Sequence, residues 1–183
     1  MTALGLITTA SQQYQQLQAE PPAGAPALNM NIGGTGGAGS GVIIGRSIST
    51  VQLWTDLSAA SPVPGNPNGS IDIRPLGEPG LCLTVPGGNY HSGVQLQVQA
   101  CDGNVDQEFQ DFSAGGGGRG LVPFAAKQLC LQAGASILQG EPVTLQACAP
   151  PTNLTANDNW HAYYAGWDGW GGFTNLVPPA LRS

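Results

Sequence analysis

Four cysteines are the residues whose type and spacing most directly predict chemistry. They form two groups, Cys82 with Cys101 and Cys130 with Cys148, whose members stand 19 and 18 positions apart. Neither group holds a Cys-x-x-Cys motif or a histidine at a spacing typical of metal ligands, so we expect no metal site. Four cysteines allow three disulfide pairings, of which the economical one joins the members of each group. Disulfides predict an oxidising compartment, so we expect an extracellular, secreted protein.

Side chains that could act as nucleophile, acid or base lack a recognisable arrangement. His91 and His161 have no serine or cysteine partner in a suitable setting. Paired carboxylates could be drawn from Asp102, Asp106, Glu108 and Asp111, but this acidic stretch is more typical of a solvated loop and strand. We therefore expect no enzymatic activity, no catalytic residue and no cofactor.

A glycine-rich tract, residues 33–41, could suggest a phosphate-binding loop. No Lys-Ser or Lys-Thr follows it, no helical pattern begins after it, and the formal net charge is −6 with five Lys plus Arg. A P-loop needs those features, and an acidic chain disfavours phosphate. We expect the tract to form a hairpin or a loop, and we expect no nucleic-acid partner.

The elements that must position these side chains recur along the chain. Cys130 follows Cys82 by 48 positions and Cys148 follows Cys101 by 47, a period typical of repeated supersecondary units. Short β-prone runs lie between turns rich in the 28 glycines and 15 prolines. This composition predicts an all-β domain with many tight turns.

A third copy is expected one period upstream, where cysteines are absent. Val51–Trp54 resembles Leu96–Gln99, and Leu28–Ile32 alternates apolar and polar residues as residues 71–74 do. The expected organisation is an arm over residues 1–25, lobes over residues 26–69, 70–118 and 119–165, and an aromatic tail over residues 166–183.

The two clear repeats resemble the ricin B-chain type lectins, a β-trefoil family. Lobes of that family carry a Cys-Leu-x-x strand, a Gln-x-aromatic-x-Cys strand and a closing Gln-x-Trp. The residues that carry the resemblance are Cys82–Val85, Gln97–Cys101 and Gln107–Phe109 in one lobe, and Cys130–Ala133, Thr144–Cys148 and Asp158–Trp160 in the next. The resemblance implies an all-β, three-lobed β-trefoil with a degenerate first lobe. It also favours the disulfides Cys82–Cys101 and Cys130–Cys148.

The resemblance further implies which side chains would bind a sugar. Family members that bind sugar use an acidic residue soon after Cys-Leu, an aromatic face, and an Asn or Gln near the closing motif. Polar groups fix the orientation of the ligand and the ring supplies apolar area. In this sequence the acid position holds Thr84 and Gln132, and the aromatic position holds Gln99 and Gln146. Binding of galactose in the family's manner is therefore not expected.

The closing edge of each clear lobe keeps polar candidates for a sugar site. They are Asp106 and Gln107 in one lobe and Asn157 and Asp158 in the next. A different glycan could use the loop Asn89-Tyr90-His91, which otherwise would be a solvated turn.

Aromatic residues divide between the core and the candidate sites. The closing aromatics Phe109 and Trp160 are expected to pack in the core, as they do in the family. Trp54 keeps an aromatic residue in the first lobe, but no lobe has a complete sugar-binding set.

Sequence signals for secretion are mixed. Two sequons, Asn68-Gly69-Ser70 and Asn153-Leu154-Thr155, are candidate glycosylation sites and would make the protein a glycoprotein. Residues 1–10 hold a short apolar run without a basic flank, which predicts no membrane span and makes a poor signal peptide. Either a leader is missing from this numbering or secretion follows another route.

Two functions from different classes fit these observations. The first is a secreted, noncatalytic, lectin-like protein that binds a glycan through degenerate sites. The alternative is an extracellular structural subunit that contacts protein partners, and that self-assembles into a homo-oligomer or filament or joins an enzyme through its trefoil and its two ends.

Overall fold

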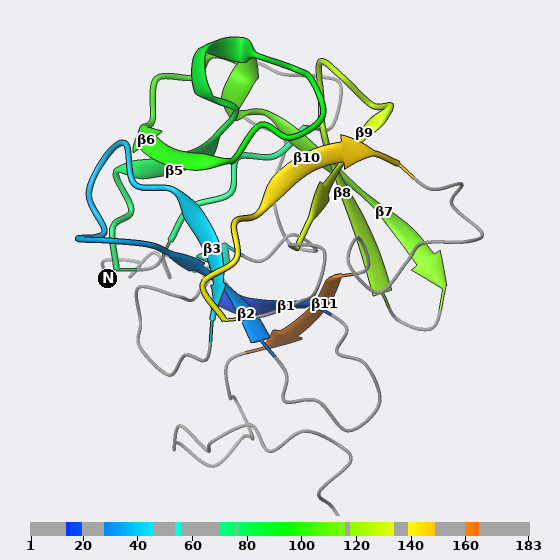
Figure 1. Ribbon diagram of the computed structural model, residues 1–183, viewed down its shortest axis with the longest axis horizontal. Helices are drawn as coiled ribbons and strands as arrows, with labels where there is room; N and C mark the ends of the chain where they lie inside the picture. Colours follow the sequence, from blue (N-terminus) through cyan, green and yellow to red (C-terminus); the bar gives the residue numbers. More distant parts are fainter. Residues whose placement is uncertain are drawn as a thin grey trace, which may run out of the picture.

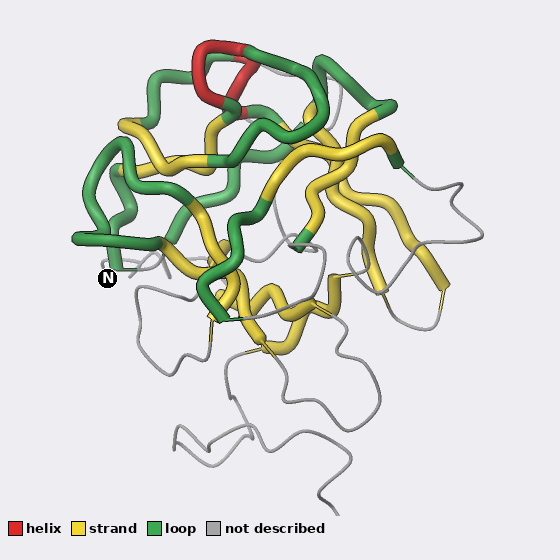
Figure 2. Tube along the Cα trace, in the orientation of Figure 1, coloured by secondary structure: helices red, strands yellow, loops and turns green. Residues whose placement is uncertain are grey.

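The computed structural model describes residues 14–19, 28–45, 54–55, 70–75, 77–115, 118–133, 139–148 and 160–164. Regular structure in these ranges consists of strands and two single-turn 3₁₀ helices (Figure 1, Figure 2). The elements are β1 Tyr14–Ala19, β2 Leu28–Ile32, β3 Val42–Gly45, β4 Trp54–Thr55, β5 Leu81–Thr84, η2 Pro86–Gly88, β6 Gln97–Ala100, η3 Val105–Gln107, β7 Phe109–Gly115, β8 Gly118–Pro123, β9 Leu129–Gln132, β10 Thr144–Ala147 and β11 Trp160–Tyr164.

The chain repeats one arrangement three times. A central antiparallel hairpin is formed by β2 with β3, by β5 with β6, and by β9 with β10. Each hairpin lies between a first and a last strand of its own lobe. The first strands are β1, residues 71–75 and β8, and the last strands are β4, β7 and β11. The first and last strands pair within and between lobes, and β1 and β11 lie side by side just below the centre of Figure 1.

An aromatic residue at the start of each last strand marks the lobe boundaries. Each of the three pairs once with the first strand of its own lobe and once with that of the following lobe. The pairs are Trp54 with Gln15 and Pro75, Phe109 with Ile71 and Pro123, and Trp160 with Arg119 and Ala19. Because the third lobe pairs back onto β1, the set of strands closes on itself and β1 is not left as a free edge.

Three equivalent backbone groups meet where the lobes converge. Val42 donates its N–H to the carbonyl of Leu96 at 2.8 Å, and Leu96 donates to Val143 at 2.9 Å. Val143 donates back to Val42 at 2.9 Å, which completes a cycle. All three side chains are fully buried. This cycle satisfies backbone groups that burial would otherwise leave unpaired.

A glycine three positions before each of these residues joins one lobe to the next. Gly39 donates its N–H to Val98 in the second lobe, and Gly93 donates to Leu145 in the third. Gly140 donates to the first lobe in the same way. Their φ angles are 86°, 90° and 90°, a region that side chains with a Cβ enter only with strain. The glycine-rich tract is thus a hairpin loop whose end is part of the lobe junction.

The core is built from apolar residues that alternate along the strands. It includes Phe109 and Trp54, both with no exposed surface, and the indole Nε1 of Trp54 donates to the carbonyl of Met30 at 2.8 Å. The other fully buried large side chains are Met30, Ile44, Ile73, Leu83, Leu96, Leu121, Leu131 and Leu145. Burying the indole without a bonded N–H would cost free energy, so this hydrogen bond holds Trp54 inward.

Both predicted disulfides are confirmed. Cys82 is bonded to Cys101 and Cys130 to Cys148, and no described cysteine is free. Each bond ties the start of a hairpin to the residue that follows its second strand. Neither described helix is long or apolar enough to cross a membrane.

The first lobe differs from its expected boundaries. Tyr14–Ala19, placed in the arm, forms β1 and pairs with β11, β2 and β4. Leu28–Ile32 is the first hairpin strand, equivalent to Leu81–Thr84 rather than to residues 71–74. Pairing along both edges satisfies the backbone of β1, and this outweighs its polar, glutamine-rich composition. Residues 1–13 and 166–183 lie outside the described residues.

Candidate functional site

The hairpin of each lobe presents two positions that correspond to the acid and the aromatic of a sugar site. The first position is one residue beyond the buried Met30, Leu83 or Leu131. The second position is one residue beyond the partner of that buried residue in the opposite strand. Asn31, Thr84 and Gln132 occupy the first position, and Gly45, Gln99 and Gln146 occupy the second. No lobe carries a carboxylate or an aromatic ring at these positions, so none offers the family's full combination of groups.

In the first lobe, the side chain of Asn31 blocks the second position, at Gly45. Asn31 is only 4 % exposed, and its Nδ2 atom is 2.7 Å from the point where a Cβ on Gly45 would lie. The Asn31 amide therefore fills the space that a ring at position 45 would need. Trp54, expected to supply the first lobe's aromatic group, is instead a core residue equivalent to Phe109. This assignment corrects the expectation, which relied on matching Val51–Trp54 to the wrong strand.

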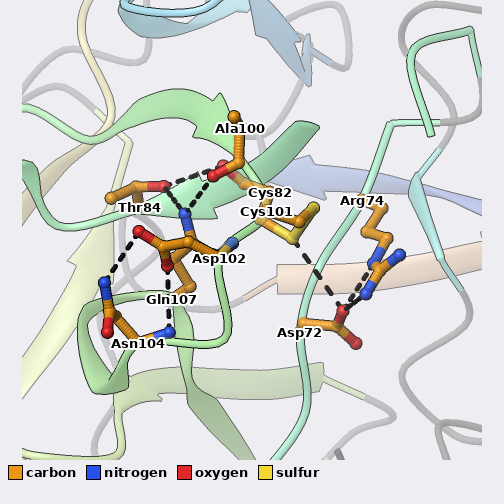
Figure 3. The surroundings of a disulfide bond; sticks show 9 residues. All are labelled: Asp72, Arg74, Cys82, Thr84, Ala100, Cys101, Asp102, Asn104 and Gln107. Atoms are coloured by element: carbon orange, nitrogen blue, oxygen red, sulfur yellow. Dashed lines mark hydrogen bonds and ion pairs between the residues drawn. A yellow bond between two sulfur atoms is a disulfide. The ribbon is translucent and has the colours of Figure 1, made fainter. Parts of the chain in front are cut away.

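In the second lobe, Gln107 is an internal clamp. Its Nε2 donates to Thr84 Oγ1 at 3.2 Å and to the carbonyl of Ala100 at 2.9 Å. Its Oε1 accepts the backbone N–H of Asp102 at 2.9 Å. Figure 3 shows these bonds beside the disulfide Cys82–Cys101. Since the amide is 3 % exposed and bonded on both atoms, Gln107 holds β5 against the end of β6 and presents no group to a ligand.

Thr84 is likewise turned inward. It is 1 % exposed, and its hydroxyl also donates to the carbonyl of Cys82 at 2.9 Å. The hydroxyl is thus used within the hairpin, beneath the surface where the family's acid would stand.

Two turns bring the remaining second-lobe candidates together. The turn η2 packs against η3, and Val85, just before η2, donates its N–H to the carbonyl of Asp106 in η3 at 2.9 Å. Asn89 follows η2; its side chain is exposed and donates to the carbonyl of Pro86 at 3.1 Å. His91 is exposed, with its Nδ1 3.1 Å from the carbonyl oxygen of Ser92.

Among these candidates, Tyr90 and Asp106 are the residues with buried polar atoms. The ring of Tyr90 packs against the core, while its hydroxyl is buried without a hydrogen-bond partner among protein groups. Asp106 Oδ1 is also buried without such a partner. Burial raises the pKa of the Tyr90 phenol above its ordinary value, and the charges of Asp106 and Glu108 raise it further. The phenol therefore stays protonated and can donate a hydrogen bond.

Carboxylates dominate the electrostatics around the turns. Asp102 is exposed and bonds to Asn104, and Glu108 accepts a hydrogen bond from Ser70 at 3.1 Å. Of the cationic side chains that the structure describes, Arg74 pairs with Asp72 and Lys127 lies over the ring of Phe124.

We name the set Asn89, Tyr90, His91 and Asp106 the turn cluster. Within the described ranges, no three His, Cys, Asp or Glu side chains are grouped as metal ligands.

The third lobe repeats the hairpin but only part of its site is described. Gln146 Nε2 donates to Thr144 Oγ1 at 3.3 Å, as Gln99 donates to Gln97 at 3.4 Å in the second lobe. The candidates Asn157 and Asp158 and the sequon residues Asn68 and Asn153 lie outside the described residues. Trp160 occupies its expected closing position in the backbone register.

Asn31 is a polar position of the hairpin that the cysteine repeat does not reveal. Its signal is the pattern Leu28-Asn29-Met30-Asn31, in which the buried Met30 precedes a polar residue just as Leu83 precedes Thr84. Without a cysteine in the first lobe, the pattern could not be aligned with the other hairpins.

Comparisons with known proteins agree with this architecture. Residues 69–167 match the model of the ricin-type beta-trefoil lectin domain. The designed threefold-symmetric protein ThreeFoil superposes with a TM-score of 0.62 at 16 % identity, over 81 % of this chain and 96 % of that one. The C-terminal half of the earthworm R-type lectin, solved with GalNAc, gives a TM-score of 0.53 at 15 % identity, over 83 % and 98 %. The β-trefoil fold is thereby confirmed.

An enzyme is also among the similar structures. The exo-beta-1,3-galactanase of Clostridium thermocellum gives a TM-score of 0.66 at 13 % identity, over 85 % of this chain but 31 % of the galactanase. The chain thus spans less than a third of that enzyme. No curated protein sequence matches it significantly.

Proposed function

Because the chain belongs to the ricin-type beta-trefoil lectin domain family, we propose that it is a secreted, noncatalytic carbohydrate-binding protein whose ligand site is the turn cluster of the second lobe. The observation that supports this proposal is the packing of η2 against η3, since Asn89, Tyr90 and His91 follow the first turn and Asp106, whose Oδ1 has no hydrogen-bond partner among protein groups, lies in the second. A carboxylate that accepts sugar hydroxyls is the strongest neutral-ligand acceptor a protein can offer.

The site would work without the family's stacking ring. Asn89 and His91 are exposed beside Tyr90 and would add hydrogen bonds at the rim, while Gln97 and Gln99 are half-buried on the outer face of β6. Loss of the ring removes apolar contact area, so binding would depend on several hydrogen bonds and would be weak for a monosaccharide. We therefore expect a glycan longer than one sugar as the ligand. In the similar structures, the earthworm lectin is bound to GalNAc.

Secretion rests on the two disulfides. Both close short loops within single lobes, and bonds of this kind persist in oxidising compartments. The noncatalytic assignment is supported by the composition of the turn cluster, which contains one carboxylate and no serine or cysteine nucleophile.

A glycan array tests the proposal. The wild-type protein should bind a defined set of glycans, and Asp106→Ala should weaken binding to them at least about tenfold, since a charge-assisted hydrogen bond contributes about 1.5–3 kcal/mol. Glu78→Ala is the matched control, because Glu78 is an exposed carboxylate of the same lobe. Equal losses in the two variants, or no binding by the wild type, would count against the proposal.

The alternative, assembly through the two ends of the chain, remains a second proposal for residues 1–13 and 166–183. Tyr14–Ala19 is used within the fold, so a test by truncation must retain β1. Light scattering of the full chain and of a variant lacking residues 1–13, at several concentrations, distinguishes an assembly from a monomer.

A further inference from the structure

The two disulfides have the same place in their lobes but different surroundings. In each bond the first cysteine is buried, with Cys82 1 % exposed and Cys130 without exposed surface. The second cysteine, Cys101 or Cys148, is half-buried. In the third lobe, Cys148 Sγ lies 3.8 Å from the carbonyl oxygen of Lys127 at the exposed surface. A reagent in solution is therefore expected to attack the sulfur of the second cysteine.

A carboxylate lies beside the buried sulfur of the second lobe. Asp72 Oδ2 is 3.9 Å from Cys82 Sγ, in a partly buried contact (Figure 3). The same oxygen accepts a hydrogen bond from Arg74 Nε and forms an ion pair with the guanidinium. The side chain of Arg74 is 41 % exposed and that of Asp72 is 26 % exposed, so water screens the positive charge more than the negative one. The Asp72 charge thus disfavours a thiolate at Cys82.

The third lobe has no carboxylate at the corresponding position. Pro75 and Pro123 are equivalent, because each pairs with the aromatic residue that closes the preceding lobe. Asp72 stands three residues before Pro75, and Gly120 stands three residues before Pro123. The position that places a negative charge beside Cys82 is therefore occupied by a glycine in the lobe of Cys130.

This difference bears on thiol–disulfide exchange. The thiolate of a small thiol attacks the sulfur of the second cysteine, the S–S bond breaks, and the first cysteine leaves as a thiolate. A second thiolate attacks the reagent's sulfur in the mixed disulfide, which releases the second cysteine and forms the disulfide of the reagent. Both released thiolates then take up protons. In the second lobe the leaving thiolate would form against the Asp72 carboxylate, and this repulsion slows the exchange.

We propose that Cys130–Cys148 is the redox-sensitive bond of this protein, which small thiols reduce before Cys82–Cys101, and that Asp72 protects the bond of the second lobe. Reduction would free the residue that follows β10 from the start of β9. The second lobe, which carries the turn cluster, would keep its bond. This inference does not depend on the proposed carbohydrate-binding function.

The first test measures the reduction of the two bonds in the folded protein. The full chain is treated with dithiothreitol, samples are quenched with acid and alkylated, and peptide mass spectrometry follows each cysteine pair over time. Cys130 and Cys148 should be alkylated at least about tenfold faster than Cys82 and Cys101. Equal rates, or faster reduction of Cys82–Cys101, would overturn the inference.

Two variants of the ion pair separate charge from loosening of the structure. Asp72→Asn should speed the reduction of Cys82–Cys101 at least about threefold, whereas Arg74→Gln should slow it, because it leaves the carboxylate unneutralised. A structural effect would speed the reaction in both variants, and that outcome would overturn the role of Asp72, as would an unchanged rate in Asp72→Asn. Glu78→Gln is the matched control: it removes the same charge at an exposed position of the lobe and should change the rate less than about twofold.

A final control repeats the measurement in urea above the unfolding midpoint. The fold no longer holds Asp72 against Cys82 there, so the two bonds should be reduced at similar rates. A difference that persists in the unfolded chain would assign it to neighbouring residues in the sequence and would overturn the proposed protection by Asp72.

Discussion

The side-chain amide of Gln107 donates a hydrogen bond to the hydroxyl of Thr84, 3.2 Å away across the second lobe. Both residues are buried, and in the family both positions belong to the sugar site. In this chain they are joined beneath the surface, and the next residue toward the N-terminus, Asp106, keeps an unpartnered carboxylate oxygen. For this reason we propose the site at the turns η2 and η3 rather than on the face of the hairpin.

Gln107→Ala should destabilise the protein. It removes two donated bonds and one accepted bond at a side chain that is 3 % exposed, and a loss of about 2–4 kcal/mol in the free energy of unfolding is expected. Urea denaturation measures it. Gln99→Ala is the control, because Gln99 is half-buried and bonds only to Gln97 in the described contacts; that variant should change stability by less than about 1 kcal/mol.

Removing β1 should abolish cooperative folding. A variant lacking residues 1–19 loses the strand that pairs with β11, β2 and β4, so the set of strands no longer closes. A variant lacking residues 1–13 retains β1 and should unfold cooperatively, as the full chain does. Thermal unfolding followed by circular dichroism makes the comparison; a sharp, wild-type-like transition without residues 1–19 would show that β1 is dispensable.

Gly93→Ala should cost about 1–2 kcal/mol. Its φ is 90°, and a new Cβ would meet no atom within 4 Å, so backbone strain alone would cause the loss. Gly37→Ala is the matched control: Gly37 also has open space around it and does not have a positive φ. Its stability should be unchanged or slightly higher, because alanine reduces the freedom of the unfolded chain. Equal stability of the two variants would refute the role of the positive-φ glycine in the lobe junction.

The pKa of Tyr90 should lie above 10.0, raised first by burial and then by Asp106 and Glu108. A raised pKa in the folded state means that the neutral phenol is favoured, so its stabilising effect is complete below pH 10 and is lost as the pH rises through the folded-state pKa. NMR titration of the ring resonances measures the value. Asp106→Asn should lower the pKa toward 10 because one negative neighbour is removed; an unchanged pKa would contradict the proximity of the two groups.

The second and third lobes could be predicted from the sequence because their cysteines mark the register. Cys82 and Cys101 lie on either side of a Gly-rich turn region, and the pairing of their strands follows once they are joined. The buried Phe109 follows from the closing motif. In these lobes the repeated strand pattern and the predicted disulfide indicate the same pairing of strands, so the fold of each lobe could be predicted from two kinds of signal.

The first lobe could not be placed for physical reasons. The composition of β1 does not favour a strand, and its stability comes from partners distant in sequence, chiefly β11. Its only apolar signal is Leu17-Gln18-Ala19, which corresponds in register to Ile73-Arg74-Pro75 and Leu121-Val122-Pro123. Contacts of this kind are invisible to local patterns.

The residues of the proposed site were candidates from the sequence, but their arrangement in space could not be predicted. Tyr90 and Asp106 were both candidates, yet their meeting depends on the packing of two turns that lie well apart in the sequence. Gln107 was expected beside Asp106 at the ligand and is instead turned inward. Adjacent residues in a turn point in different directions, which spacing alone does not reveal.

We propose that a glycan binds at the turns of the second lobe. The most direct measurement is a ¹H–¹⁵N NMR titration of the assigned full chain with the best glycan from the array. The largest shift changes are expected at residues 87–91 and 104–108. Changes confined to the third-lobe hairpin at residues 143–147, or to the two ends of the chain, would contradict this location.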